Sequence, residues 1–194
     1  LVDDDEDDYV ITSDIFEDST HIHFELEWVK NYQDALDVIL TNEHDVYLID
    51  YHLGSHNGLD IVKQALAHKC KKPLILLTGQ GDREIELRAL EIGASDYLIK
   101  GQFSSDLLER SITYAIRHKH TLNSLEESES RYRAVIESQK ELICRFTPET
   151  ILTFVNGAYC RYFQKSAEEL IGHSWLELVP KNQHEEIKAH IASL

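Results

Sequence analysis

Three short, uninterrupted apolar runs mark the first half of the chain, at residues 46–49, 74–77 and 97–99. Runs of this length that are rich in β-forming residues are typical of strands buried on both faces of a parallel sheet. Before and between the runs, apolar residues recur at helical spacing, which predicts amphipathic helices over residues 35–40, 59–66 and 85–92. Strands and helices therefore alternate, and this order predicts a doubly wound α/β fold.

A polar residue follows each apolar run directly: Asp50, Thr78 and Lys100. Leu1-Val2 has the composition of a strand end, and the acidic cluster Asp3-Asp4-Asp5 follows it. In open α/β sheets, ligands bind beyond the carboxyl ends of the strands, near the point where the strand order reverses. We therefore expect these polar side chains to form one site.

The residue types in this site favour phosphate chemistry. Carboxylates crowded into one crevice repel one another unless a cation joins them, and Mg²⁺, which prefers oxygen ligands, fits best. Asp50 stands alone at a strand end and is the candidate nucleophile toward a phosphoryl group. Lys100 would neutralise the oxygens of the transferring group, and the Thr78 hydroxyl would hold one of them.

This combination resembles the receiver domain of two-component response regulators. The family pattern has an acidic pair after the first strand, a phospho-accepting Asp after the third, Thr or Ser after the fourth and Lys after the fifth. The matching residues here are Asp3 and Asp4, Asp50, Thr78 and Lys100. The resemblance covers roughly residues 1–120, and it implies a flavodoxin-like sheet of five parallel strands.

The resemblance also implies a metal site. Asp4, Asp50 and the backbone carbonyl of His52 would bind Mg²⁺, and Asp3 would support the cation from behind these ligands. Three consecutive acids also allow a shift of register by one residue, which would bring Asp5 into the site.

A switch and a partner follow from the same resemblance. Tyr97, three residues before the Lys, occupies the family's switch position. Phosphorylation of Asp50 would draw the Thr78 hydroxyl inward and let Tyr97 rotate toward the interior, which would shift the populations of two states. The phosphoryl donor would be a histidine kinase or a phosphotransfer protein, and the chain would be a signalling switch rather than a metabolic enzyme.

Other interpretations compete with this one. Asp50 could cap the following helix, and Glu6, Asp7 and Asp8 are expected to be solvated charges at a helix start. A phosphatase of the haloacid dehalogenase type is disfavoured, because it requires a second Asp where His52 stands. The last alternative is an interaction module that is not phosphorylated and in which a second domain does the sensing.

Composition narrows the class of protein further. The formal net charge of -16 argues against a nucleic-acid surface, which needs clustered Lys and Arg. No stretch approaches the roughly 20 apolar residues of a membrane span. The 3 cysteines lack metal-ligand spacing and are expected to be reduced thiols in a cytoplasmic protein. Because the chain has no Met and opens at the tail of a strand, we expect it to be part of a longer product.

A long helix is predicted over residues 105–138, because no Gly or Pro occurs between Ser104 and Ser138. Its first part would pack on the sheet through Leu107, Leu108, Ile112, Ala115 and Ile116. An apolar stripe continues beyond, at Leu122, Leu125, Tyr132, Val135 and Ile136. We expect this linker helix to form a homodimer as a parallel coiled coil, and the alternative is a solvated helix stabilised by i,i+4 ion pairs.

The remaining residues, 139–194, predict a β-hairpin followed by small helices. The hairpin strands lie at residues 142–146 and 152–156, and Ser166 with Glu169 forms a capping box. Together with residues 131–135, 159–160 and 166–172, these features resemble the first half of a PAS sensor domain. No cofactor is assigned to this half.

Overall fold

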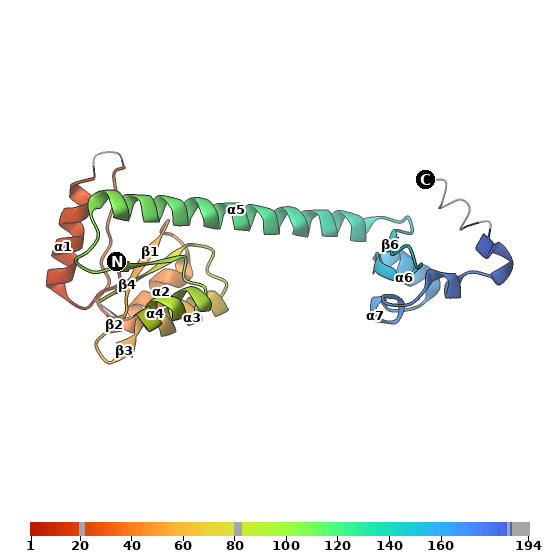
Figure 1. Cartoon of the computed structure of the whole chain (residues 1–194), viewed down its shortest axis with the longest axis horizontal. Coiled ribbons are helices and arrows are strands. Elements are labelled where there is room, and N and C mark those ends of the chain that lie inside the picture. Colours follow the sequence, from red (N-terminus) through yellow and green to blue (C-terminus); the bar gives the residue numbers. More distant parts are fainter. Residues whose placement is uncertain (20–21, 80–82, 186, 188–194) are drawn as a thin grey trace. The chain divides into compact units, whose positions relative to one another are not determined.

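The computed structural model describes residues 1–19, 22–79, 83–185 and 187 of the 194-residue chain. The chain divides into two compact units, Leu1–Ser124 and Leu125–Leu194. The boundary falls within the long helix α5, Ser105–Ser138, which is continuous as the sequence predicts (Figure 1).

The first unit contains a parallel sheet with three strands in the order β1-β4-β5. Their bounds are β1 (Tyr47–Asp50), β4 (Leu74–Thr78) and β5 (Asp96–Ile99). All residues of β1 and β4 are buried, because helices cover both faces of the sheet. All three predicted strands are confirmed.

The expectation of five regular strands is only partly met. Val2 forms single parallel bridges to Val29 on one side and to Ile49 on the other, so two further segments extend the sheet beyond β1 without forming regular strands. Two hydrogen bonds join Val2 to β1, from Val2 N to Leu48 O and from Asp50 N to Val2 O, each 2.8 Å long.

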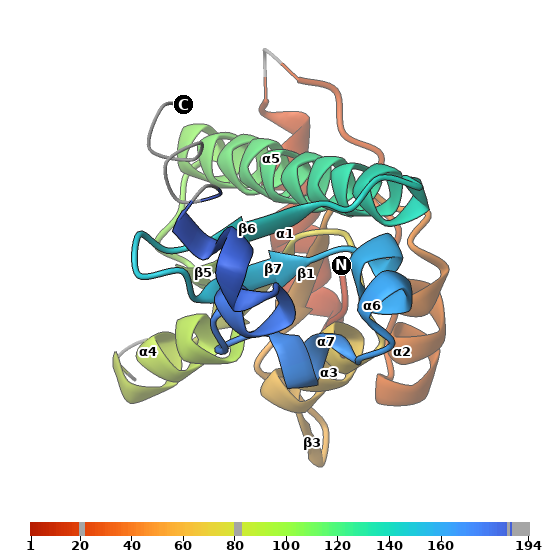
Figure 2. The same ribbon diagram turned by 90° about the vertical axis from the view of Figure 1, so that its right-hand side faces the viewer.

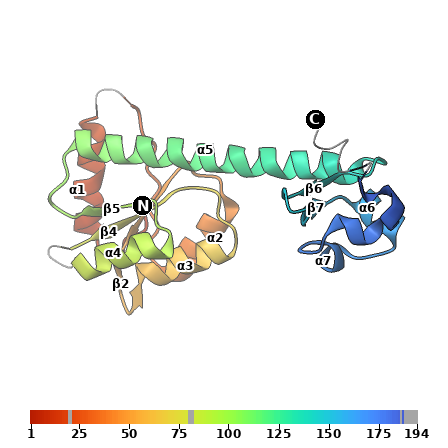
Figure 3. The same ribbon diagram turned by 45° about the vertical axis from the view of Figure 1, so that its right-hand side comes forward.

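Five helices cover the sheet in the described part of the first unit. Helices α1 (Glu6–Glu17) and α5 lie on one face, and α2 (Tyr32–Thr41), α3 (Gly58–Ala67) and α4 (Arg83–Ile92) lie on the other (Figure 3). Successive strand residues point to opposite faces. In β4, Leu76 therefore packs with α2–α4, while Ile75 and Leu77 pack with α5. The predicted contacts of α5 are confirmed: Leu108, Ile112 and Ala115 are buried against the sheet, and Leu107 and Ile116 are partly buried there.

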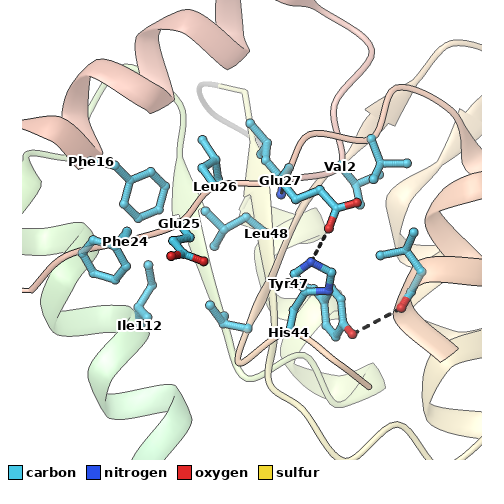
Figure 4. Close-up of a pocket in the computed structure, with 14 residues that line it drawn as sticks. Val2, Phe16, Phe24, Glu25, Leu26, Glu27, His44, Tyr47, Leu48 and Ile112 are labelled. Carbon is cyan, nitrogen blue, oxygen red and sulfur yellow. Dashed lines mark hydrogen bonds and ion pairs between the residues drawn. The ribbon is translucent and has the colours of Figure 1, made fainter. Parts of the chain in front are cut away.

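A small hairpin, β2 (His52–Leu53) with β3 (His56–Asn57), connects β1 to α3. At the amino end of β1, a cavity of about 60 Å³ lies between α1, the segment around Val29 and the sheet (Figure 4). It is lined mainly by apolar side chains, and His44 and Glu27, which share a hydrogen bond, are among the lining residues. None of the predicted site residues lines this cavity.

In the second unit, the end of α5 is followed by the antiparallel hairpin of β6 (Cys144–Phe146) and β7 (Leu152–Val155), whose strands run side by side (Figure 2). Helices α6 (Gly157–Phe163) and α7 (Ala167–Leu170) follow, and then two 3-10 turns, η1 (Trp175–Leu178) and η2 (Lys181–Gln183). The predicted capping box of Ser166 and Glu169 is present at α7. The buried core of this unit consists of Leu152, Val155, Tyr159, Leu170 and Trp175.

Buried Asn156 joins several segments of this unit. Its Oδ1 accepts hydrogen bonds from Ile143 N and Tyr159 N, at 3.1 and 3.0 Å. Its Nδ2 donates to Ile136 O and Glu141 O, at 3.2 and 2.9 Å. One amide therefore caps α6 and ties the end of α5 to the hairpin.

Candidate functional site

The carboxyl ends of the strands bring the polar residues together. Asp50 is the last residue of β1 and Thr78 the last of β4, and Lys100 follows β5 directly. The register pairs Asp50 with Leu77 and Thr78 with Ile99, so the three strands end at nearly the same level. Asp3 reaches the same edge because Val2 pairs beside β1.

Lys100 lies at the centre of an ion-pair cluster. Its Nζ is 2.8 Å from Asp3 Oδ2, 2.8 Å from Asp50 Oδ1 and 2.6 Å from Asp8 Oδ2. The side chains of Asp3 and Asp50 are buried, and those of Lys100 and Asp8 are 20% and 34% exposed. One ammonium group thus serves three carboxylates, and an excess of negative charge remains.

Burial, the contacts with Lys100 and this excess of negative charge together shift the pKa values of the cluster. Burial alone would lower the pKa of Lys100, but its hydrogen bonds to Asp3, Asp50 and Asp8 outweigh burial and raise it. Burial raises the pKa of Asp50 to about 6, opposed by Lys100 and reinforced by the charges of Asp3 and Asp8. Burial also raises the pKa of Asp3. Lys100 therefore stays charged, while each buried carboxylate is destabilised as an anion.

The acidic residues are arranged to accept a cation. One carboxylate oxygen from each of Asp3, Asp4 and Asp50 lies within 4.8 Å of the others. Asp4 is exposed and accepts a hydrogen bond from Gly54 N at 3.0 Å. The side chain of Asp5 instead caps α1 by accepting from Asp7 N at 2.8 Å. Three carboxylate oxygens at this spacing suit a hard divalent cation such as Mg²⁺.

The expectation for Asp8 as a solvated charge is wrong. Asp8 lies in the first turn of α1 and its carboxylate contacts Lys100. Side chains of a helix tilt toward its N-terminus, which here meets the strand ends. Its position three residues after the N-cap Asp5 is the signal that the sequence offered, but the ion pair itself spans 92 residues of chain.

The remaining predicted residues flank the cluster. Thr78 is buried, and its hydroxyl has no hydrogen-bond partner among the described residues. Tyr97 is half-buried on β5 and packs against the core beneath α2–α4. A hydrogen bond to Glu86 is the main cause that raises the pKa of Tyr97. The side chain of His52 is exposed in β2.

Two local interactions define the surroundings of Asp50 and Asp3. Asn57, not Asp50, caps α3, by accepting from Leu59 N at 2.8 Å, so the helix-cap interpretation of Asp50 is wrong. Trp28 Nε1 donates to Asp3 O at 2.8 Å. The Trp28 ring stacks on Tyr9, with ring centroids 4.2 Å apart, and this aromatic pair was not expected from the sequence.

Comparison with known proteins identifies the fold and the family. A family model for the response regulator receiver domain matches residues 1–112, which is more than half of the chain. The chain belongs to the response regulator receiver family. A second model, for the PAS fold, matches residues 130–194. A receiver domain is therefore followed by a PAS fold.

Curated relatives of this receiver are named as transcriptional regulatory proteins. It is 32% identical over 91 residues to the transcriptional regulatory protein CusR of Escherichia coli. This match covers 47% of this chain and 40% of CusR. It is 28% identical over 114 residues to the transcriptional regulatory protein SrrA of Staphylococcus aureus. This match covers 59% of this chain and 46% of SrrA. The chain thus spans less than half the length of these two relatives.

Solved structures support the same family. The receiver domain of the Francisella response regulator 1452 superposes with a TM-score of 0.52 at 26% identity, covering 60% of this chain and 93% of that domain. A receiver domain from Clostridium thermocellum has a TM-score of 0.55 at 24% identity, covering 62% of this chain and 94% of that one, and shows the shared fold. In the described part of the chain, no helix has the length and apolar character needed to cross a membrane.

Proposed function

We propose that this receiver is a phosphorylation-dependent switch in which Asp50 accepts a phosphoryl group from a histidine kinase or a phosphotransfer protein. The observation that carries the proposal is the setting of Asp50: buried at a strand end, 2.8 Å from Lys100 Nζ, and grouped with two further carboxylates. Nothing else in the described residues combines an acid, a cation and a cation-binding group so closely.

In the proposed step, a carboxylate oxygen of Asp50 attacks phosphorus. An O–P bond forms while the P–N bond of phosphohistidine breaks, and the electron pair of that bond leaves with the imidazole nitrogen. Lys100 would stabilise the charge on the phosphoryl oxygens. The Thr78 hydroxyl, buried without a partner among the described residues, would donate to one of these oxygens.

Receiver domains generally bind Mg²⁺ at an acidic pocket, and the residues here fit that ion. We assign Asp4, Asp50 and the backbone carbonyl of His52 as ligands, with Asp3 behind them. Bound Mg²⁺ would supply positive charge that offsets the phosphoryl oxygens. The carboxylates of Asp3, Asp4 and Asp50 support this assignment by their mutual spacing.

The switch would use Thr78 and Tyr97. Engagement of the Thr78 hydroxyl by the phosphoryl group would vacate space beside β4, and Tyr97 would then turn inward from its half-buried position. The surface formed by α4, β5 and the start of α5 would change with it. This surface includes the part of α5 that precedes the PAS fold in the chain.

Intact-mass spectrometry tests the central proposal. The chain is incubated with Mg²⁺ and acetyl phosphate, in which the P–O bond to acetate breaks instead of a P–N bond. We expect one phosphoryl adduct that requires both Mg²⁺ and Asp50 and is absent in Asp50→Asn. The matched control is Asp60→Asn, an exposed acid on α3. No adduct in folded wild-type protein that binds Mg²⁺ would favour the alternative, an interaction module that is not phosphorylated.

The arrangement of the chain is the second part of the proposal. We infer a receiver at residues 1–120, a linker helix at 105–138 and the first part of a PAS domain at 139–194, with the linker carrying the state of Asp50 to the PAS fold. The linker would also form a parallel homodimer. Four side chains of its predicted apolar stripe are exposed: Leu122, Leu125, Tyr132 and Val135. The ion pair of Arg133 with Glu129 fits the solvated-helix alternative as well.

We infer the kind of partner and the cellular compartment of the protein from its net charge and its thiols. The formal net charge of -16 disfavours a direct nucleic-acid partner for this chain. The cysteines Cys70, Cys144 and Cys160 are free, which supports a reducing, cytoplasmic compartment.

A further inference from the structure

Three carboxylates surround the ammonium group of Lys100, which carries three N–H donors. Its Nζ donates hydrogen bonds to Asp3 Oδ2 and Asp8 Oδ2, and Asp50 Oδ1 lies 2.8 Å away as a third ion-pair partner. A phosphoryl oxygen on Asp50 therefore competes with these carboxylates for the donors of Lys100. The identity of the carboxylate that leaves determines how readily the site accepts the group.

Of the three contacts with Lys100, the one to Asp8 requires the least free energy to break. The Asp3 carboxylate is buried, and its Oδ1 also accepts from Asp5 N at 3.1 Å. Asp50 is the residue that carries the group. The Asp8 side chain is 34% exposed at the first turn of α1, so water can solvate it once it turns away. Its contact with Lys100 is nevertheless the shortest of the three, at 2.6 Å.

We propose that Asp8 is a positioning residue that holds Lys100 in the unphosphorylated receiver and competes with the phosphoryl group for it. This inference rests on the proposed acceptance of a phosphoryl group by Asp50. Phosphorylation replaces the single negative charge of the Asp50 carboxylate with up to two on the phosphoryl group, within reach of the Asp8 carboxylate, and like charges so close repel. Asp8 therefore opposes the phosphorylated state twice, by occupying a donor of Lys100 and by its own charge.

The direction of the effect separates this role from metal binding. If Asp8 competes for Lys100, replacing it with Asn frees a donor and strengthens binding of a phosphoryl group at saturating Mg²⁺. If Asp8 were a metal ligand, the same change would weaken Mg²⁺ binding and phosphorylation together. Its oxygens are not part of the group formed by Asp3, Asp4 and Asp50.

The experiment uses beryllofluoride, a stable mimic of the phosphoryl group, at saturating Mg²⁺. Affinity is followed by the fluorescence of Trp28, which contacts Asp3, in a Trp175→Phe background. We expect Asp8→Asn to bind about fivefold more tightly than the parent, the size of a partly exposed ion pair. The acyl phosphate formed with acetyl phosphate should also last longer. In Asp8→Glu, whose carboxylate can still reach Lys100, the beryllofluoride affinity and the lifetime of the acyl phosphate should be close to those of the parent.

Asp7→Asn is the matched control, because Asp7 is exposed in the same helical turn and changes the net charge equally. Equal behaviour of Asp8→Asn and Asp7→Asn would overturn the inference, and so would weaker beryllofluoride binding by Asp8→Asn. These outcomes differ from failure of the proposed function, in which the parent itself forms no adduct and binds no beryllofluoride.

Discussion

Replacement of Asp50 by Asn should stabilise the metal-free receiver. The amide side chain keeps nearly the shape of the carboxylate but carries no charge, so the substitution removes the anion that burial disfavours. Burial raises the pKa of Asp50 from 3.8 to about 6. A difference of about two pH units between the folded and unfolded states corresponds to about 3 kcal/mol at neutral pH.

The sign of the pH dependence follows from the same shift. Because the folded state holds the Asp50 proton more tightly, it binds more protons than the unfolded state between about pH 4 and pH 6. The wild-type chain therefore loses stability as the pH rises through this window. Asp50→Asn lacks this loss, so the two proteins should diverge as the pH rises and differ by a constant amount above about pH 7.

Urea unfolding in EDTA at pH 7.5, followed by Trp28 fluorescence in the Trp175→Phe background, measures the difference. We expect the gain for Asp50→Asn to be about 1.5–3 kcal/mol, because the neutral amide does not keep the full interaction with Lys100. This gain raises the urea midpoint by about 1 M for an ordinary dependence on urea. Saturating Mg²⁺ should shrink or reverse the difference, because it binds the wild-type site more tightly.

The matched control is Asp37→Asn, which removes an exposed carboxylate from α2 and should change the midpoint little. A lower midpoint for Asp50→Asn in EDTA would refute the reasoning. A wild-type stability that does not fall between pH 4 and pH 6, relative to the variant, would refute it equally. Either result would mean that Lys100 compensates the Asp50 charge fully.

Three further changes test other parts of the structure. Gly58→Ala should destabilise the receiver by about 3 kcal/mol in urea unfolding, because a Cβ there would lie 2.1 Å from Asp50 O. The control is Gly79→Ala, where an added Cβ meets no atom of the described residues within 4 Å, and equal losses of stability in the two variants would contradict this packing argument. Asn156→Ala should destabilise the PAS unit by about 3 kcal/mol, because it removes four hydrogen bonds. We expect faster hydrogen exchange at residues 143 and 159 in this variant. Asn182→Ala, at an exposed position, should leave these exchange rates unchanged. Leu122→Glu with Leu125→Glu should lower the mass in light scattering toward that of a monomer, and an unchanged mass would remove the coiled-coil proposal.

The apolar pattern of the sequence was sufficient for much of the fold. Strands buried on both faces leave continuous apolar runs, and these predicted β1, β4 and β5. The absence of Gly and Pro predicted α5, and capping residues marked α7. These features are local, because each depends on residues a few positions apart in the chain. The prediction of five regular strands was only partly confirmed, because Val2 and Val29 join the sheet by single bridges.

Part of the candidate site could also be predicted from local patterns in the sequence. The end of each buried strand is visible in the sequence, and parallel strands end at one edge of the sheet, so the neighbourhood of Asp50, Lys100 and the first acids could be predicted. The sequence left open which of the acids belong together. The structure groups Asp3, Asp4 and Asp50 and uses Asp5 to cap α1.

The order of strands and helices, and the sheet edge at which the polar residues meet, could therefore be predicted from local patterns of residues. Two features could be seen only in the folded chain: how Lys100 divides its contacts, including the one to Asp8, and that the Thr78 hydroxyl is buried without a partner among the described residues. The difference arises from distance along the chain. Local periodicity records which face of an element is buried, but an ion pair between residues 92 positions apart depends on the packing of α1 against the sheet, which no local pattern encodes.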